Sequence, residues 1–145
     1  KELEKAILNS NSAIIHLRRG DYVNNNNKKL FHQLGRSYFD QGMKLIRKKE
    51  DNIKFYVFSD DINFAKSFFN YDDKLVFMNT HNSKNGFRDM HLMSMCKNII
   101  ISNSTFSWWA AWLGSDNKKT IVAPKLWFKQ KKVSHEYYLP EWNVI

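Results

Sequence analysis

Short apolar runs alternate with amphipathic stretches along the whole chain. The runs are short for buried helices and therefore predict strands, at 13–17, 53–58, 75–78, 98–102 and 119–123. Stretches with helical spacing lie between them, at 1–9, 36–49, 62–69, 88–96 and in the segment that ends at 113. Apolar strands without strict alternation are typical of a parallel sheet that is covered on both faces. The pattern predicts an α/β fold with a largely parallel sheet and helices on both faces.

The polar stretches between these elements predict loops. Four consecutive asparagines favour a polar, mobile loop at 23–29, and a second polar loop is expected at 79–86. The segment from about 124 onward is aromatic and basic, and we expect it to pack back on the body of the protein, although it shows no legible secondary structure. Because no repeat or boundary is visible, residues 1–145 are interpreted as one domain.

Composition and charge narrow the classes of partner. Apolar residues make up 43% and aromatic residues 15% of the 145 residues, a globular composition that excludes a disordered chain. Lys and Arg total 23 against 14 acidic residues, and the net charge of +9 favours a nucleic acid, an acidic membrane surface or a phosphorylated small molecule. The lysines are dispersed, so a basic arm is not evident.

Cys96 is the only cysteine and cannot form an internal disulfide. Together with the absence of a signal peptide, this indicates a reducing cytoplasm. No apolar run approaches the ~20 residues of a membrane-spanning helix. The histidines show no zinc-like spacing with Cys96, so no metal site is predicted. The chain opens without an initiator methionine, which suggests a fragment of a longer protein.

The first candidate site is the stretch I-I-H-L-R-R-G-D-Y at 14–22. His16 lies near the end of a predicted strand, Arg18 and Arg19 follow it, and Asp21 lies in the predicted turn. Polar groups at the carboxyl end of a parallel strand face the crevice where ligands bind, and guanidinium groups suit phosphate oxygens. Surface arginines, a turn-forming aspartate and a core histidine are the alternatives, and this stretch alone does not decide between them.

The second candidate site is N-S-T-F-S, between another predicted strand and the start of a helix. Backbone N–H groups at a helix start, together with three hydroxyl groups, make an anion site. A simple helix cap is the alternative, and for a single segment of this kind it is the commoner outcome. The segment comprises Asn103, Ser104, Thr105, Phe106 and Ser107.

Three acidic residues have two interpretations each. Asp89 opens a predicted helix, where the helix dipole explains it, but a carboxylate in a nucleotide crevice can also accept hydrogen bonds from guanine. For Asp60 and Asp61, which follow a predicted strand, helix capping is favoured. If Asp89 and the two strand ends converge on one crevice of a parallel sheet, they form the layout expected of a nucleotide-diphosphate site.

The motifs H-L-R-R-G-D-Y, F-S-D-D and D-M-H-L-M-S-M-C-K-N-I-I-I-S-N-S-T-F-S-W-W-A-A-W-L-G together resemble the bacterial-type α-1,2-fucosyltransferases of glycosyltransferase family 11. The resemblance covers about 12–142, including P-K-L-W-F near the end. The first motif is shared with α-1,6-fucosyltransferases and protein O-fucosyltransferases, whereas the long block is specific. The resemblance implies a Rossmann-like lobe that binds GDP-fucose, the C-terminal one of two lobes in a GT-B-like glycosyltransferase.

The resemblance also implies an inverting, metal-independent transfer of L-fucose from GDP-β-L-fucose to the 2-hydroxyl of galactose in a glycan, without a cofactor. Carried over by motif position, Arg18 contacts the β-phosphate, and His16 and Asp89 contact the guanosine. Arg18 and Asp21 are the catalytic residues that it implies. The remaining donor-binding positions are Arg19, Asn103, Ser104, Thr105, Phe106 and Ser107.

Two features depart from the family pattern. Related α-1,6 enzymes carry a glutamate shortly after the first motif, where this chain has Asn24 to Asn27, so Asp21 or His32 is left as the general base. The G-L-G-N-Q segment of the N-terminal lobe is absent from these residues, and the acceptor side of the site is expected to be missing with it. We therefore expect the residues alone to bind the donor weakly and to lack catalysis.

Two functions from other classes stay open. Charge and aromatic content also suit a nucleic-acid or polyanion-binding module, although dispersed lysines and aromatics in apolar runs argue against it. A non-catalytic GDP-binding fragment is the other. From the resemblance, we expect a role in lipopolysaccharide or other surface-glycan synthesis, no nucleic-acid partner and a cytoplasmic location, with peripheral association at the inner membrane face as an open alternative.

Overall fold

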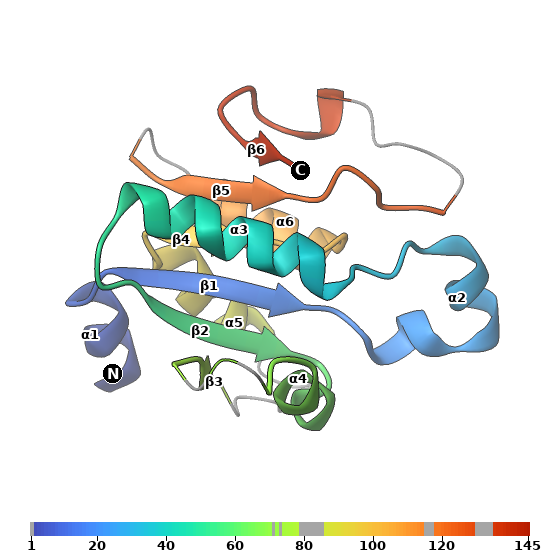
Figure 1. The fold of residues 1–145 in the computed structure, drawn as a ribbon, viewed down its shortest axis with the longest axis horizontal. Coiled ribbons are helices and arrows are strands. Elements are labelled where there is room, and N and C mark those ends of the chain that lie inside the picture. Colours follow the sequence, from blue (N-terminus) through green and yellow to red (C-terminus); the bar gives the residue numbers. More distant parts are fainter. Residues whose placement is uncertain (1, 71, 73, 79–85, 115–117, 130–134) are drawn as a thin grey trace.

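A computed structural model describes residues 2–70, 72, 74–78, 86–114, 118–129 and 135–145. Their strands form one parallel sheet of six, in the order β3-β2-β1-β4-β5-β6 (Figure 1). The α/β prediction is therefore confirmed, and β1 lies in the middle of the sheet between β2 and β4. The strands are β1 Ser12–Leu17, β2 Lys54–Ser59, β3 Val76–Phe77, β4 Asn98–Ile100, β5 Thr120–Ala123 and β6 Asn143–Val144.

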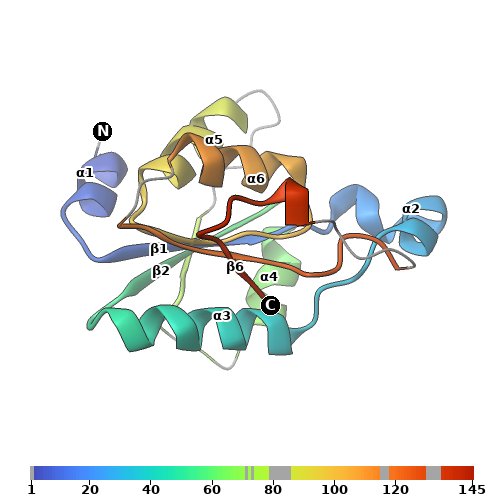
Figure 2. The ribbon, with the colours of Figure 1, turned by 90° about the horizontal axis from the view of Figure 1, so that it is seen from above.

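Helices cover the sheet on both sides, with α5 and α6 on one face and α3 on the other (Figure 2). Side chains of one strand point alternately to the two faces, so Ile14 packs in the core under α5 and α6, whereas Ile15 packs in the core under α3 and α4. The helices are α1 Glu2–Leu8, α2 Asn25–Leu30, α3 Arg36–Lys49, α4 Ile62–Phe68, α5 Gly86–Met95 and α6 Thr105–Leu113, with short 3₁₀ helices η1 Gly20–Val23 and η3 His135–Tyr137. None of the helices described is long and apolar enough to cross a membrane.

The prediction of a loop at 23–29 is wrong, because most of this stretch belongs to helix α2. The side chain of Asn24 accepts a hydrogen bond from the backbone N–H of Asn27 at 2.9 Å and caps the helix start. A run of asparagines therefore supplies its own N-cap, which a reading of asparagine as a loop residue misses. Residues 79–85 of the second predicted loop lie outside the described residues.

The tail packs back on the body of the protein, as the sequence predicts. Tyr138 and Trp142 lie in the core on the α5–α6 face, and Asn143–Val144 adds the sixth strand beside β5. A strand of two residues has too little periodicity to be recognised in the sequence. The tail therefore pairs with β5, which would otherwise be the edge strand of the sheet.

Tyr38 ties helix α3 to the centre of the sheet. Its hydroxyl donates to the carbonyl of Ile101 at 2.6 Å, and the carbonyl of Val122 lies at 3.3 Å. Burial raises the pKa of Tyr38 well above its ordinary value, so the hydroxyl stays protonated and keeps donating.

We expect Tyr38→Phe to lower the free energy of unfolding by about 1–2 kcal/mol, because it leaves buried carbonyl groups without this donor. Urea unfolding of the chain measures the change. The matched control is Tyr137→Phe, at a side chain that is 61% exposed. A Tyr38→Phe loss no larger than that of the control would contradict the structural role of this hydrogen bond.

Candidate functional site

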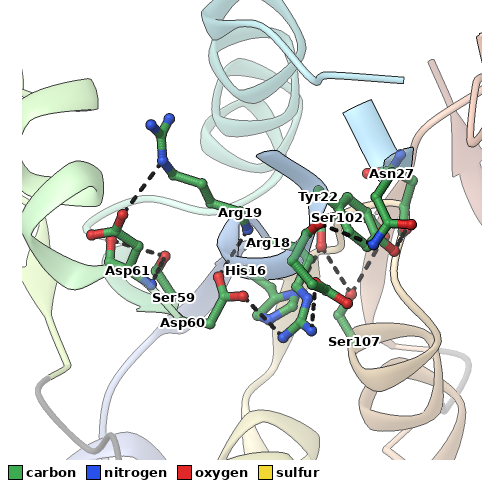
Figure 3. Close-up of polar contacts among 12 residues, drawn as sticks. His16, Arg18, Arg19, Tyr22, Asn27, Ser59, Asp60, Asp61, Ser102 and Ser107 are labelled. Carbon is green, nitrogen blue, oxygen red and sulfur yellow. Dashed lines mark hydrogen bonds and ion pairs between the residues drawn. The ribbon is translucent and has the colours of Figure 1, made fainter. Parts of the chain in front are cut away.

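The predicted strand ends meet at the carboxyl edge of the sheet. Ile15 of β1 pairs with Ile100 of β4, so the residues that follow the two strands leave the sheet side by side. On the other side of β1, Leu17 pairs with Ser59 at the end of β2. The edge therefore brings together three chain segments that the sequence analysis treats separately, and Figure 3 shows their polar side chains converging.

His16 forms the buried part of the site. Its Nδ1 lies 2.8 Å from the Oγ of Ser102, and Ser102 Oγ lies 3.4 Å from the Oγ of Ser107 on α6 (Figure 3). The ring of His16 also packs on Phe106, with centroids 5.5 Å apart. The structure thus joins His16 to the predicted segment on α6 through Ser102, a residue that sequence reasoning did not single out.

Arg18 lies just past the end of β1 and is held by two carboxylates. Its guanidinium contacts Asp21 Oδ1 at 2.8 Å and Asp60 Oδ2 at 3.0 Å. The side chain is 31% exposed, so it remains accessible at the mouth of the crevice. Two charge-assisted contacts fix the orientation of a side chain that would otherwise be flexible.

Arg19 reaches away from Arg18, toward the α3–α4 face (Figure 3). Its Nε lies 3.4 Å from Asp61 Oδ2, and its guanidinium stacks 3.5 Å from the ring centroid of Phe64 on α4. The two arginines therefore do not form one clamp. Arg19 belongs to the other side of the strand end, and its role in donor binding stays a prediction.

The capping prediction is right for Asp61 and wrong for Asp60. Asp61 accepts from the backbone N–H of Phe64 at 3.0 Å and caps α4. Asp60 instead accepts from the backbone N–H of Arg19 at 2.8 Å and pairs with Arg18. A Cβ on Gly20 would collide with Asp60 Oδ2, so a side chain at this position would displace the carboxylate of Asp60. Sequence reasoning missed this role because it depends on β2 lying beside β1.

Asn103 braces the crevice from the β4 side. Its Nδ2 donates to the backbone carbonyls of His32 at 2.9 Å and Trp127 at 2.8 Å. The backbone carbonyl of Asn103 accepts from the hydroxyl of Tyr22 at 2.7 Å. Burial raises the pKa of Tyr22, which keeps this donor protonated at neutral pH. Asn103 is almost fully buried and ties three loops together.

The remaining predicted residues lie on or beside the α6 start. Ser104 precedes α6 as its N-cap position, and Thr105 is exposed at the first turn. A Cβ on Gly86 would lie 3.7 Å from Phe106, so the start of α5 lies beside the start of α6. Asp89 lies in the first turn of α5 and is 6% exposed. The structure therefore brings the predicted residues to the carboxyl end of the sheet, and the ligand contact of each stays a prediction.

Within the described part of the chain, no group of three or more His, Cys, Asp or Glu side chains is arranged to hold a metal ion. The turn after β1 and the end of β2 together carry two arginines and three carboxylates, namely Arg18, Arg19, Asp21, Asp60 and Asp61. The positive charge of Arg18 is therefore already balanced by carboxylates. An anionic ligand would replace Asp21, whose side chain is 52% exposed, as a partner of Arg18.

The model of the family described as Glycosyl transferase family 11 matches residues 2–145. The chain is 38% identical over 121 residues to the O-antigen biosynthesis glycosyltransferase WbnK of Escherichia coli. The aligned residues make up 83% of this chain and 40% of that protein. It is 36% identical over 146 residues to an alpha-1,2-colitosyltransferase of Escherichia coli, covering 97% of this chain and 49% of that protein.

A third relative is the galactoside 2-alpha-L-fucosyltransferase SEC1 of Bos taurus, 27% identical over 133 residues, which covers 88% of this chain and 36% of that protein. The chain thus spans half the length or less of these curated relatives. No solved structure matches it.

We expect Asp60→Asn to lower the free energy of unfolding by about 1 kcal/mol, because the neutral amide keeps the shape of the carboxylate but loses its charge-assisted contacts. Urea unfolding at neutral pH measures the change, and high salt should reduce it. The control is Asp51→Asn, on the exposed surface between α3 and β2. Equal losses at the two positions would show that Asp60 does not hold the turn.

Proposed function

The chain belongs to glycosyltransferase family 11, and we propose that it is the donor-binding lobe of an α-1,2-fucosyltransferase. The proposed reaction transfers L-fucose from GDP-β-L-fucose to the 2-hydroxyl of galactose in a glycan. The observation that carries the proposal is Arg18, oriented at the carboxyl end of a central strand whose neighbour, β4, leads into the hydroxyl-rich start of α6. Such a strand end is where α/β proteins bind nucleotides.

In the proposed complex, Arg18 binds the β-phosphate in place of Asp21. His16 and Asp89 contact the guanosine, with Asp89 accepting from the N–H groups of the base. His16 is suited to a fixed contact because Ser102 orients its ring from the buried side. The start of α6 contributes the backbone N–H groups of its first turn and the side chains of Ser104, Thr105, Phe106 and Ser107.

The proposed chemistry is a single displacement that inverts the anomeric carbon. The 2-hydroxyl oxygen of the acceptor bonds to C1 of fucose while the bond from C1 to the β-phosphate oxygen breaks, and GDP leaves with both electrons. Negative charge then grows on the β-phosphate, where Arg18 stabilises it more in the transition state than in the bound donor. We propose that the guanidinium supplies this stabilisation without a metal ion, so activity should persist in excess chelator.

A general base must take the proton of the acceptor hydroxyl. The candidates on this chain are Asp21 and His32, and only the first is held by Arg18. When a phosphate replaces Asp21 as the partner of Arg18, the carboxylate of Asp21 is released beside the reacting groups. This release would couple donor binding to activation of the acceptor. The acceptor itself would be positioned by parts of the protein outside these residues, since the curated relatives are at least twice as long.

The similarity to the alpha-1,2-colitosyltransferase favours a second donor sugar, colitose. The similarity to an O-antigen glycosyltransferase favours a surface polysaccharide as the acceptor. Product analysis with GDP-fucose, GDP-colitose and a panel of galactose-terminated acceptors separates these possibilities. The protein to use is one that contains this chain together with its facing lobe.

We expect Arg18→Ala to reduce kcat by about 100- to 1000-fold, as for loss of one donor that stabilises developing charge. Turnover of GDP-fucose measures the change, and circular dichroism checks that the fold is kept. The control is Arg47→Ala, which removes a surface arginine that pairs with Asp72 on the same protein. Near-normal turnover of Arg18→Ala would remove Arg18 from the mechanism.

We expect Asp89→Asn to weaken the binding of GDP by about tenfold and the binding of UDP much less, because an amide cannot accept hydrogen bonds from both N–H groups of guanine at once. Calorimetry with the two nucleotides measures the difference. Equal losses would exclude the contact with the base. The same experiment includes a single-stranded oligonucleotide, and tight, salt-dependent binding of the oligonucleotide without binding of GDP would favour a nucleic-acid module instead.

A further inference from the structure

The segment P-K-L-W-F at 124–128 follows β5 and has no part in the proposed function so far. Its end runs antiparallel to the residues that follow α2. Two backbone hydrogen bonds of 2.9 and 3.0 Å join 30–32 to 127–129, and they flank a bridge between Phe31 and Phe128. At a bridge of this kind the facing side chains lie close together. The segment after β5 is therefore joined to the chain that leaves the candidate site.

Phe128 begins a stack of three rings that ends at Tyr22. Its ring centroid lies 5.4 Å from that of Phe31, and the centroid of Phe31 lies 4.1 Å from that of Tyr22, with the two planes 5° apart. The guanidinium carbon of Arg18 lies 5.8 Å from the centroid of Tyr22, within the range of a cation–π contact. The aromatic stack therefore connects the segment after β5 to the arginine that the proposed function assigns to the β-phosphate.

A second connection runs through Asn103. Its side-chain amide donates to the carbonyl of Trp127 at 2.8 Å, and its backbone carbonyl accepts from the hydroxyl of Tyr22 at 2.7 Å. Tyr22 is thus held at its hydroxyl by the residue that precedes Ser104, the N-cap position of α6, and at its ring by the aromatic stack. Both contacts come from parts of the chain other than its own turn.

The turn that carries Tyr22 has little support of its own. The 3₁₀ helix η1 has four residues, of which Tyr22 is the buried one, and α2 has no buried residues. Both lie beyond the carboxyl end of the sheet (Figure 1). Packing against other elements is what stabilises most short helices. The aromatic stack and Asn103 are therefore the contacts that fix the position of Tyr22.

We infer that the segment at 124–128 positions Arg18 for the β-phosphate, with Tyr22 as the positioning residue that links them. The inference rests on the proposed function. Asp21 and Asp60 hold the guanidinium, and the proposed phosphate replaces Asp21. Arg18 then keeps Asp60 and the ring of Tyr22. The ring restricts the guanidinium without occupying an N–H group, because a cation–π contact uses none of its hydrogen bonds.

The ratio of the dissociation constants of GMP and GDP tests the inference, because only GDP has a β-phosphate. The protein to use contains this chain together with its facing lobe, and calorimetry measures both constants. Phe128→Leu removes the last ring of the aromatic stack. It should weaken the binding of GDP relative to that of GMP by about three- to tenfold, because Arg18 then meets the β-phosphate in a less defined orientation.

A conservative variant and a second site of interruption accompany this change. Phe128→Tyr keeps the ring and should keep the ratio. Phe31→Leu interrupts the same stack from the other segment and should shift the ratio as Phe128→Leu does, and circular dichroism checks the fold of each variant. The matched control is Tyr137→Leu, which removes a ring of the same tail that is 61% exposed and should leave the ratio unchanged.

Dependence on Arg18 separates positioning from a general loss of structure. In a protein that carries Arg18→Ala, adding Phe128→Leu should not change the ratio further, since the group that the segment positions is absent. An equal shift with and without Arg18 would overturn the inference, because the segment would then act through the start of α6 or through the fold.

An unchanged ratio in Phe128→Leu and Phe31→Leu, with GDP bound normally, would also overturn the inference and would leave the proposed function standing. Failure of the unaltered protein to bind either GMP or GDP would overturn the proposed function itself.

Discussion

The carboxylate of Asp60 is the contact on which the site depends. It accepts from the backbone of Arg19 and pairs with the side chain of Arg18, and it occupies the space that a side chain on Gly20 would need. One group at the end of β2 therefore sets the conformation of the turn after β1. Both arginines diverge from that turn, so their positions depend on a contact between neighbouring strands.

The alternation of side chains along β1 divides the edge into two compartments. His16 belongs to the side of α6, where Ser102 and Ser107 orient it, and Leu17 belongs to the side of α3. The proposed function places the guanosine on the α6 side, beside His16, and the diphosphate at Arg18, where the strand ends.

Charge acts locally in this protein. The net charge of +9 is spread along the sequence, while the turn after β1 and the end of β2 together carry more carboxylates than arginines. Held between Asp21 and Asp60, Arg18 is oriented before any ligand arrives, and a phosphate needs only to replace the more exposed carboxylate. This arrangement suits a small anion of defined geometry better than an extended polyanion, which requires a continuous basic surface.

The sequence by itself determined the α/β class, the extent of α3, the cap at Asp61 and the family, because periodicity, capping and motifs are local properties. It also indicated His16, Arg18 and the segment at 103–107, since these polar groups directly follow apolar runs. Only the tertiary structure decided that Arg18 and Arg19 separate, that Asp60 holds their turn, that Ser102 orients His16 and that Asn103 braces the turn through Tyr22. These contacts join residues far apart in the chain, and their partners follow from strand order and register, which the local pattern does not contain.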